Sequence, residues 1–262
     1  MKCNDIFSYL KELYPLHLAM EWDNSGFLIG RYDRDVKNVL VVLDITNAVI
    51  DFAVQNNVDL IIAHHPIIFS SIKRISEDTL LGKYILKIIE NNISVIAMHT
   101  NFDVARDGMG DVAANRLHLR NTSPLEVTFS DEMGELGVGK IGELEASMDF
   151  DKFIDLVKSA FELNTLAIYG RENIKGDIKR VAISPGSGKG MYKYALKKAD
   201  VLITGDITHH DGLDASNDGI CIIDTTHYGL EYIFIDCIAK KLERFKDINI
   251  LKFKDTKPVE YI

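Results

Sequence analysis

The feature that most constrains the fold is the segment Asp59-Leu-Ile-Ile-Ala-His-His-Pro66, an apolar run that ends in two histidines and a proline. Such a run is typical of a strand buried on both faces of a sheet. In open α/β sheets, ligands bind at the carboxyl ends of the strands, where the following loops carry polar side chains. Neighbouring side chains of an extended chain point to opposite sides, so His64 and His65 can face two different partners, including two different metal ions. Pro66 disfavours a helical conformation at His65 and so ends the strand.

The rest of the chain alternates between strand and helix patterns. Short apolar runs predict buried strands at 39–44, 58–63, 93–98, 166–169, 180–184, 201–204, 220–224 and 248–253. Helical spacing and capping residues predict helices from Asn4 to about Pro15 and from Thr46 to about Gln55, and at 77–90, 108–119, 151–161, 191–199, 211–215 and 227–245. This alternation is typical of an α/β fold with mostly parallel sheets covered by helices.

The alternation is interrupted at 121–147, where glycines separate short apolar pieces and predict a few irregular strands. We therefore expect two α/β lobes, residues 1–120 and 121–262, with the last strand able to pack back on the first lobe. A weak internal repeat supports related lobes. The segment 59–65 resembles 200–210 (Asp-Val-Leu-Ile-Thr-Gly-Asp-Ile-Thr-His-His), which has more residues between its strand and its histidine pair.

Composition excludes several functional classes. The formal net charge of −9 argues against general nucleic-acid binding, which needs surplus Lys and Arg. The three cysteines show no CxxC spacing and leave one unpaired in any disulfide scheme, which favours a reducing compartment. The first 15 residues lack the apolar stretch of a signal peptide, and no uncharged run reaches the ~20 residues that span a bilayer. We therefore expect a cytoplasmic protein with no membrane partner.

Histidines are concentrated where ligand-binding residues are expected. Six of the eight are predicted at strand ends or helix starts: His64, His65, His99, His209, His210 and His227. His227 and Glu231 are four residues apart at the start of a predicted helix, so both project from one face. Asp103 supplies a further carboxylate after a strand. Together with His64 and His65, these residues supply three imidazoles and two carboxylates, a set suited to divalent ions such as zinc, iron or manganese.

The number of these side chains bears on the kind of site. Five ligands are more than one catalytic metal usually takes and too few for two closed structural sites. With a bridging carboxylate and waters they suit two open metals ~3.5–4 Å apart, which lower the pKa of a bridging water. The alternative for any single histidine is a hydrogen-bonded structural residue, which we favour for His17 and His118.

Other polar positions leave alternatives open. His99 and Thr100 could hydrogen-bond the metal ligands. His209 and His210 could act as catalytic acids, contact substrate or support the ligands, or they could be solvated residues at a helix start. The turn 185–190 (Pro-Gly-Ser-Gly-Lys-Gly) could hold a phosphate on its backbone amides, but it lacks the P-loop spacing, and an ordinary flexible turn explains it equally well. Trp22 lies in a tight turn, and there it could serve as a hydrophobic plug.

Five ordered motifs resemble the NIF3-like family, whose members are also labelled GTP cyclohydrolase 1 type 2 homologs. They are Trp22-Asp-Asn-x-Gly26, Ala63-His-His-Pro66, His99-Thr-Asn-x-Asp103, Thr204-Gly-Asp-x-x-His-His210 and Asp224-x-x-His-x-x-x-Glu231. The resemblance covers essentially the whole chain. Phe102 and Pro185 depart from it, because leucine and glycine are common at these positions.

The resemblance implies a NIF3-like fold of two α/β lobes with a dinuclear metal site between them, and a ring-shaped homohexamer. By position, the implied metal ligands are His64, His65, Asp103, His227 and Glu231, with Glu231 as the bridge. Some members carry an extra domain in the middle of the chain, for which the stretch 121–147 is too short here.

Two functional hypotheses follow. The first is a metal-dependent hydrolase of a nucleotide or related small molecule, in which His209 or His210 moves protons. The second is a metal-stabilised ring that binds a protein or nucleic-acid partner, although the acidic net charge weighs against nucleic acid. An open coordination position favours the enzyme.

Overall fold

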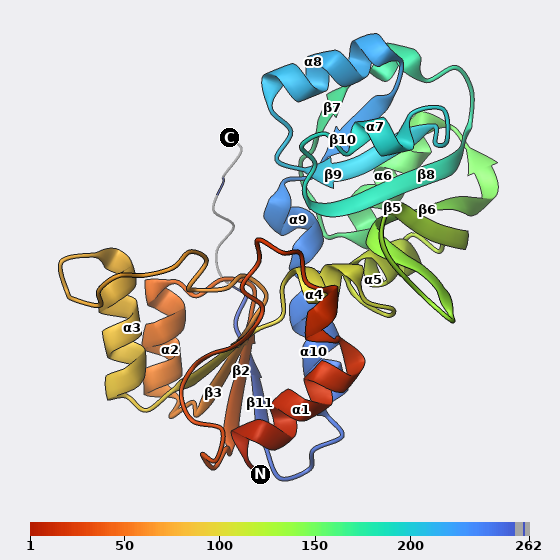
Figure 1. Ribbon diagram of the computed structural model, residues 1–262. Coiled ribbons are helices and arrows are strands. Elements are labelled where there is room, and N and C mark those ends of the chain that lie inside the picture. Colours follow the sequence, from red (N-terminus) through yellow and green to blue (C-terminus); the bar gives the residue numbers. More distant parts are fainter. Residues whose placement is uncertain (255–258, 260–262) are drawn as a thin grey trace. The chain divides into compact units, whose positions relative to one another are not determined.

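The computed structural model describes residues 1–254 and residue 259 (Figure 1). The fold divides into two compact units. The first contains residues 1–105 and 234–254, and the second contains Arg106–Ile233. The sequence suggested a division after residue 120. Residues 106–120 instead belong to the second unit because α5 (Met109–Arg116) packs on strands of that unit, where Asp111 forms an ion pair with Lys140.

The first unit is built on a sheet that is almost entirely parallel. In the described residues the strand order is β1-β4-β3-β2-β11, and only β1 runs antiparallel to its neighbour. The strands are β1 (Gly26–Ile29), β2 (Asn38–Val42), β3 (Leu60–Ala63), β4 (Ser94–Ala97) and β11 (Asn249–Lys252). Every residue of β3 and β4 is buried, as expected for strands covered on both faces.

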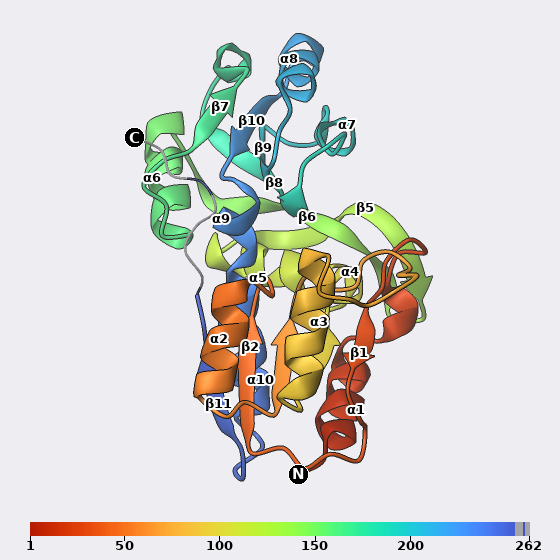
Figure 2. The same ribbon diagram turned by 90° about the vertical axis from the view of Figure 1, so that its left-hand side faces the viewer.

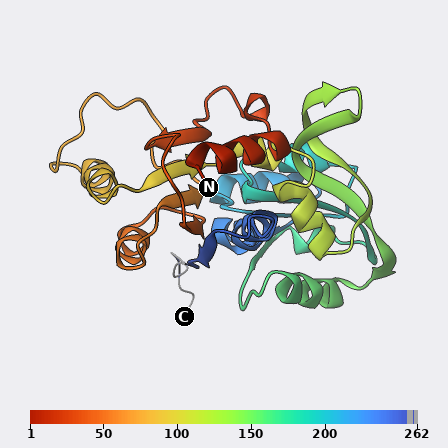
Figure 3. The same ribbon diagram turned by 90° about the horizontal axis from the view of Figure 1, so that it is seen from below.

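Helices cover both faces of this sheet. Two views show α2 (Asn47–Gln55) and α3 (Leu80–Glu90) on one face, with α1 (Cys3–Leu13) and α10 (Ile233–Leu242) on the other (Figures 1 and 3). The core under α2 and α3 is made of aliphatic side chains, among them Leu40 and Ile61 from the sheet and Ile50 and Ile85 from the helices. This packing holds the carboxyl ends of β2, β3 and β4 along one rigid edge.

Capping residues explain where several helices begin. Thr46 caps α2 by accepting a hydrogen bond from Val49 N, and Thr79 caps α3 in the same way from Gly82 N. The prediction that Asn4 caps the first helix is wrong. Lys2 is the N-cap, and its N–H donates to the carboxylate of Asp5 at 2.7 Å, so the helix starts two residues earlier than an Asn4 cap would place it.

The second unit contains a mixed sheet. In the described residues its order is β5-β6-β8-β9-β10-β7, in which β8, β9 and β10 are parallel and the other pairings are antiparallel. The strands are β5 (Arg120–Asp131), β6 (Gly134–Met148), β7 (Ala167–Tyr169), β8 (Ile178–Ser187), β9 (Val201–Gly205) and β10 (Cys221–Asp224). The expectation of mostly parallel sheets therefore holds for the first sheet only. The stretch 121–147 forms a long antiparallel hairpin, β5–β6, instead of a few irregular strands.

Helices also cover both faces of the second sheet, with α6 (Phe150–Ala160) on one side and α7 (Tyr192–Ala195) and α8 (His209–Asp218) on the other (Figure 2). The helix predicted at 227–245 is present as α9 (His227–Glu231) and α10, which meet at Tyr232. Short 3₁₀ turns occupy Leu16–Leu18 and Arg171–Asn173, and α4 (Thr100–Val104) follows β4. Among the described residues, no helix combines the length and the apolar composition needed to cross a bilayer.

The internal repeat has a structural counterpart at the starts of β3 and β9. The carboxylate of Asp59, just before β3, accepts hydrogen bonds from the backbone N–H groups of Lys37 and Asn38. Asp200, just before β9, accepts from Lys179 and Arg180 in the same manner. In each unit an aspartate therefore joins the start of one parallel strand to that of its neighbour.

Candidate functional site

The first candidate site lies at the carboxyl edge of the parallel sheet in the first unit. Val42 pairs with Ala63 and Ala63 with Ala97, so the residues that follow β2, β3 and β4 emerge side by side. This register brings together His64, His65 and His99, and one potential ligand atom from each lies within 4.8 Å of the other two. The His64 ring is fully buried.

All three imidazoles are oriented through Nδ1. Nδ1 of His64 lies 2.8 Å from the carbonyl oxygen of Met98. Nδ1 of His65 lies 2.7 Å from Oδ1 of Asp44, and Nδ1 of His99 lies 2.7 Å from Oδ1 of Asp23. An oxygen acceptor at Nδ1 favours the tautomer with the proton on that nitrogen and the lone pair on Nε2. Metal-binding histidines are commonly oriented by this arrangement.

Asp103 projects toward the same cluster from α4. Its Oδ1 lies 3.6 Å from Nε2 of His64. The sequence placed Asp103 after a strand, whereas the structure places it in a short helix that begins immediately after His99. His64, His65 and Asp103 thus form one group of predicted ligands, and His99 adds a third ring that the sequence assigned to ligand support.

Asp23 connects the Trp22 turn to this cluster. Its carboxylate side chain is fully buried and accepts hydrogen bonds from His99, from Ser25 Oγ at 2.6 Å and from both the amide and the hydroxyl of Thr100. Burial alone would raise the pKa of Asp23, but the hydrogen bonds from His99, Ser25 and Thr100 outweigh it and hold that pKa well below its usual value. Asp23 is therefore an anion at neutral pH.

The second unit positions the other two predicted ligands by the same means. His227 and Glu231 lie on α9, which Thr226 caps through Gly229 N directly after β10. Nδ1 of His227 lies 2.8 Å from Oδ2 of Asp206, and its Nε2 lies 2.9 Å from Oε2 of Glu231. Glu231 is only 3% exposed. A buried carboxylate beside an oriented imidazole is a two-ligand arrangement suited to a divalent ion.

The glycine-rich segment 185–190, which the sequence predicted as a turn and whose first three residues end β8, packs directly on this pair. Gly186 has φ +81, and a Cβ there would lie 2.5 Å from Oε1 of Glu231 and 3.8 Å from Nε2 of His227. A Cβ on Gly188 would similarly clash with Thr204. The structure thus gives these two glycines a packing role, since neither position has room for a side chain.

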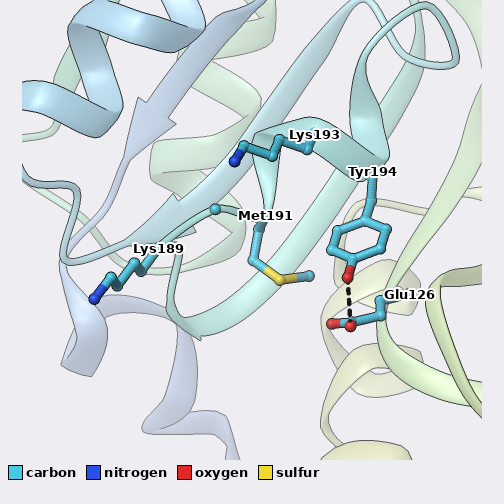
Figure 4. A pocket seen from close by; sticks show the side chains of 6 residues that line it. Glu126, Lys189, Met191, Lys193 and Tyr194 are labelled. Atoms are coloured by element: carbon cyan, nitrogen blue, oxygen red, sulfur yellow. Dashed lines mark hydrogen bonds between the residues drawn. The ribbon is translucent and has the colours of Figure 1, made fainter.

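Beyond Gly188 the turn borders a pocket of about 560 Å³ (Figure 4). Lys189, Met191 and Lys193 line it, and the hydroxyl of Tyr194 donates to Glu126 at 2.6 Å across it. The hydrogen bond to Glu126 raises the pKa of Tyr194, so the phenol remains protonated. Two lysines and the carboxylate of Glu126 line this pocket, so its charges partly offset one another and define no particular ligand.

The two residues predicted to act in catalysis, His209 and His210, open α8. Both are exposed, and their rings contact each other at 5.4 Å. They follow Asp206 by three and four residues, and Asp206 is the partner of His227. Both imidazoles are therefore solvent-accessible and lie at the start of the helix that follows the loop of Asp206.

Sequence reasoning missed the role of the carboxylates that orient the rings. Asp44 follows β2 as His65 follows the neighbouring β3, and Asp206 follows β9 as His227 follows the neighbouring β10. The sequence signal for this orienting role is a carboxylate after one predicted strand and a histidine after the next strand. The alternative of Trp22 as a hydrophobic plug is wrong, because the indole is 60% exposed.

Comparison with known proteins identifies the family. A family model described as Duf34/NIF3 (NGG1p interacting factor 3) matches residues 1–258. The chain belongs to the Duf34/NIF3 family. This confirms the family predicted from the five motifs.

Relatives and solved structures agree with this assignment. Proteins named GTP cyclohydrolase 1 type 2 homolog from Clostridium acetobutylicum and Clostridium perfringens are 36% and 32% identical to this chain. The alignments cover 93% and 100% of this chain, and 90% and 100% of those relatives.

Two crystal structures of Duf34/NIF3 family relatives show the same fold. A Bacillus cereus protein related to NIF3 matches with a TM-score of 0.89 at 26% identity, and a Staphylococcus aureus protein with 0.88 at 30%. Each match covers 100% of this chain and 99% of the other. The mixed α/β fold with two sheets is thereby confirmed.

Proposed function

We propose that this Duf34/NIF3 protein binds two divalent metal ions per chain and uses them to hydrolyse a nucleotide or a related small molecule. The ligands we assign are His64, His65 and Asp103 from the first unit and His227 and Glu231 from the second. Zinc, iron and manganese all suit this set of nitrogen and oxygen donors.

The observation that carries this proposal is the shared orientation of the imidazoles. His64, His65 and His227 each engage an oxygen through Nδ1, and His64 and His227 each direct Nε2 toward a carboxylate of the ligand set. A structural histidine needs only one such hydrogen bond. Three repetitions of the same arrangement favour a common role as metal ligands.

The side chains of this site have separate roles in the proposed reaction. Divalent ions in open sites lower the pKa of bound water and so make a nucleophile available at neutral pH. Asp44 and Asp206 hold the rings of His65 and His227, and Glu231, with two oxygens in a buried environment, is the ligand we assign as a bridge. His209 and His210 are exposed imidazoles, and histidine is the side chain that most often transfers protons in catalysis, so we assign them proton transfer to a leaving group.

The choice of substrate rests on the relatives. Their name contains GTP cyclohydrolase, so a guanine nucleotide is the first substrate to screen. We also propose a homohexamer as the assembly. The long edge strand β5, whose residues are mostly exposed, offers a surface for association with another chain.

A screen for hydrolysis tests the enzyme directly. Purified protein loaded with zinc, manganese or iron(II) is incubated with GTP, other nucleotides and nucleoside monophosphates, and products are separated by chromatography. The proposal predicts metal-dependent turnover that chelation abolishes and re-addition restores. Metal-loaded protein without turnover on the panel would favour the binding or scaffold role.

A further inference from the structure

Two large aromatic side chains are exposed next to each other in the first unit. Trp22, the chain's only tryptophan, is 60% exposed, and Phe69 is 52% exposed. Their ring centroids are 5.7 Å apart, with an interplanar angle of 44°. Exposed apolar area of this size is unfavourable in water, so two such rings gathered at one place point to a ligand.

Hydrogen bonds hold both rings in this exposed position. Asn24, two residues after Trp22, donates from Nδ2 to the carbonyl oxygen of Ile68 at 2.6 Å, which joins the turn of Trp22 to the loop of Phe69. Asp23 ties the same turn to Thr100 and His99. The two aromatic rings are therefore fixed relative to each other by groups on either side of them.

The rings also lie beside the imidazole cluster. The ring of His99 contacts Trp22 edge-on at 5.9 Å and Phe69 at 6.4 Å. His99 in turn contacts the rings of His64 and His65 at 5.2 and 5.5 Å. A planar group stacked on Trp22 or Phe69 would thus be separated by the ring of His99 from the assigned metal ligands His64 and His65.

We propose that Trp22 and Phe69 form a stacking platform for the nucleobase of the substrate. Every nucleobase has a π face, and stacking on an aromatic side chain contributes about ten- to hundredfold in affinity per base. This inference rests on the proposed function and names the part of the substrate that the aromatic rings recognise. A protein partner is a poorer fit, because two rings supply far less than the ~800 Å² that each side of a stable interface buries.

The single tryptophan makes the platform directly measurable. Guanosine 5′-monophosphate and ribose 5-phosphate are titrated into metal-loaded wild-type protein while tryptophan emission is recorded, with free N-acetyltryptophanamide as the correction for absorbed light. We expect saturable quenching by the nucleotide and none by the sugar phosphate, because only the former can stack on Trp22. Equal responses to the two ligands, or no response to either, would overturn the platform.

Variants separate stacking from general effects. Phe69→Ala retains Trp22 and should weaken nucleotide binding at least tenfold by fluorescence, and Trp22→Ala should do so by calorimetry. Tyr32→Ala removes an equally exposed ring, 53% exposed and packed on Phe7 and Phe27, and should leave binding unchanged. Wild-type affinity in Phe69→Ala and Trp22→Ala, or an equal loss in Tyr32→Ala, would contradict the inference.

Metal content measured on the same samples keeps this inference distinct from the proposed function. Protein that binds metal but shows no base-specific quenching would overturn the platform alone. Protein without metal that still shows base-specific quenching would support the platform and overturn the metal-dependent hydrolase.

Discussion

Nδ1 of His99 lies 2.7 Å from Oδ1 of Asp23, and the Asp23 side chain is fully buried. This pair links the Trp22 turn before β1 to the edge of the sheet where the imidazoles gather. The hydrogen bonds around the Asp23 carboxylate hold its pKa well below the usual value. Its ionisation therefore couples the stability of this region to pH.

Acid unfolding should reveal the charge on Asp23. Its pKa is lower in the folded than in the unfolded state, so its contribution to stability is present above the unfolded-state value of about 3.9 and is lost as pH falls through the folded-state value. We expect Asp23→Asn to reduce the free energy of unfolding of metal-free protein at neutral pH by about 1–3 kcal/mol. The free energy of unfolding of Asp23→Asn should also depend less on pH below 5 than that of the wild type. Denaturant titrations followed by circular dichroism measure both, with the exposed Asp78→Asn as control; equal pH profiles for wild type and Asp23→Asn would contradict the assignment.

Two glycines of the segment 185–190 provide a matched test of the packing against Glu231. Gly186 and Gly190 both have positive φ, but a Cβ on Gly186 would meet Glu231 at 2.5 Å, whereas one on Gly190 would have no atom within 4 Å. Alanine at either position should cost about 1–2 kcal/mol for the left-handed backbone. Only Gly186→Ala should also reduce metal affinity, because it displaces a ligand. Calorimetric metal titration distinguishes them, and equal metal affinity in the two variants would argue against Glu231 as a ligand.

The carboxylates behind the histidines should tune metal binding without being ligands. Asp44→Asn and Asp206→Asn each replace the charged carboxylate at Nδ1 of a predicted ligand by a neutral amide and retain the ring itself. Loss of such a partner typically lowers metal affinity by about 10- to 100-fold. Competition with a chromogenic chelator gives the affinity. Unchanged affinity in both variants, with Asp78→Asn as reference, would show that these aspartates do not support a metal.

The cysteines should be largely unreactive in the folded protein. Cys3 and Cys221 are fully buried, and burial raises the pKa of Cys221 to about 12, so almost none of it is thiolate at neutral pH. We expect a thiol reagent at pH 8 to modify at most Cys237 in the native protein and all three cysteines after denaturation. Rapid modification of Cys221, located by peptide mass analysis, would contradict the packing of β10.

Short stretches of the sequence were enough to predict most of the helices and strands. The buried strands β2, β3, β4 and β9 are continuous apolar runs, and Thr46 is followed by helical spacing, so a short window suffices in each case. The hairpin β5–β6 was underestimated because its strands are stabilised by pairing with each other, and their sequences show little alternation. The start of α1 was misplaced because Lys2 has no capping side chain, and the stabilising carboxylate, Asp5, lies inside the helix.

For the candidate site, local patterns could select candidate residues but not the surroundings of each side chain. Histidines and carboxylates at strand ends could be selected one by one, and the structure shows His64, His65 and Asp103 close together. That Asp44 orients His65 depends on which strands are neighbours, which no local pattern reveals. The exposure of Trp22 likewise depends on Asn24 reaching a carbonyl 44 residues away.

The metal content of the protein shows whether the assigned side chains bind two metal ions. Tag-free wild type, His65→Ala and Glu231→Ala are incubated with zinc, manganese or iron(II), desalted and examined by elemental analysis, with circular dichroism to show that each is folded. His118→Asn is the control, since His118 lies outside the proposed site and has a positive φ that asparagine tolerates. We predict close to two metals per chain in the wild type and the control, and a loss of at least one in each ligand variant. Wild-type protein without metal under all three conditions, or ligand variants that retain the full metal content, would contradict the proposed dinuclear metal site.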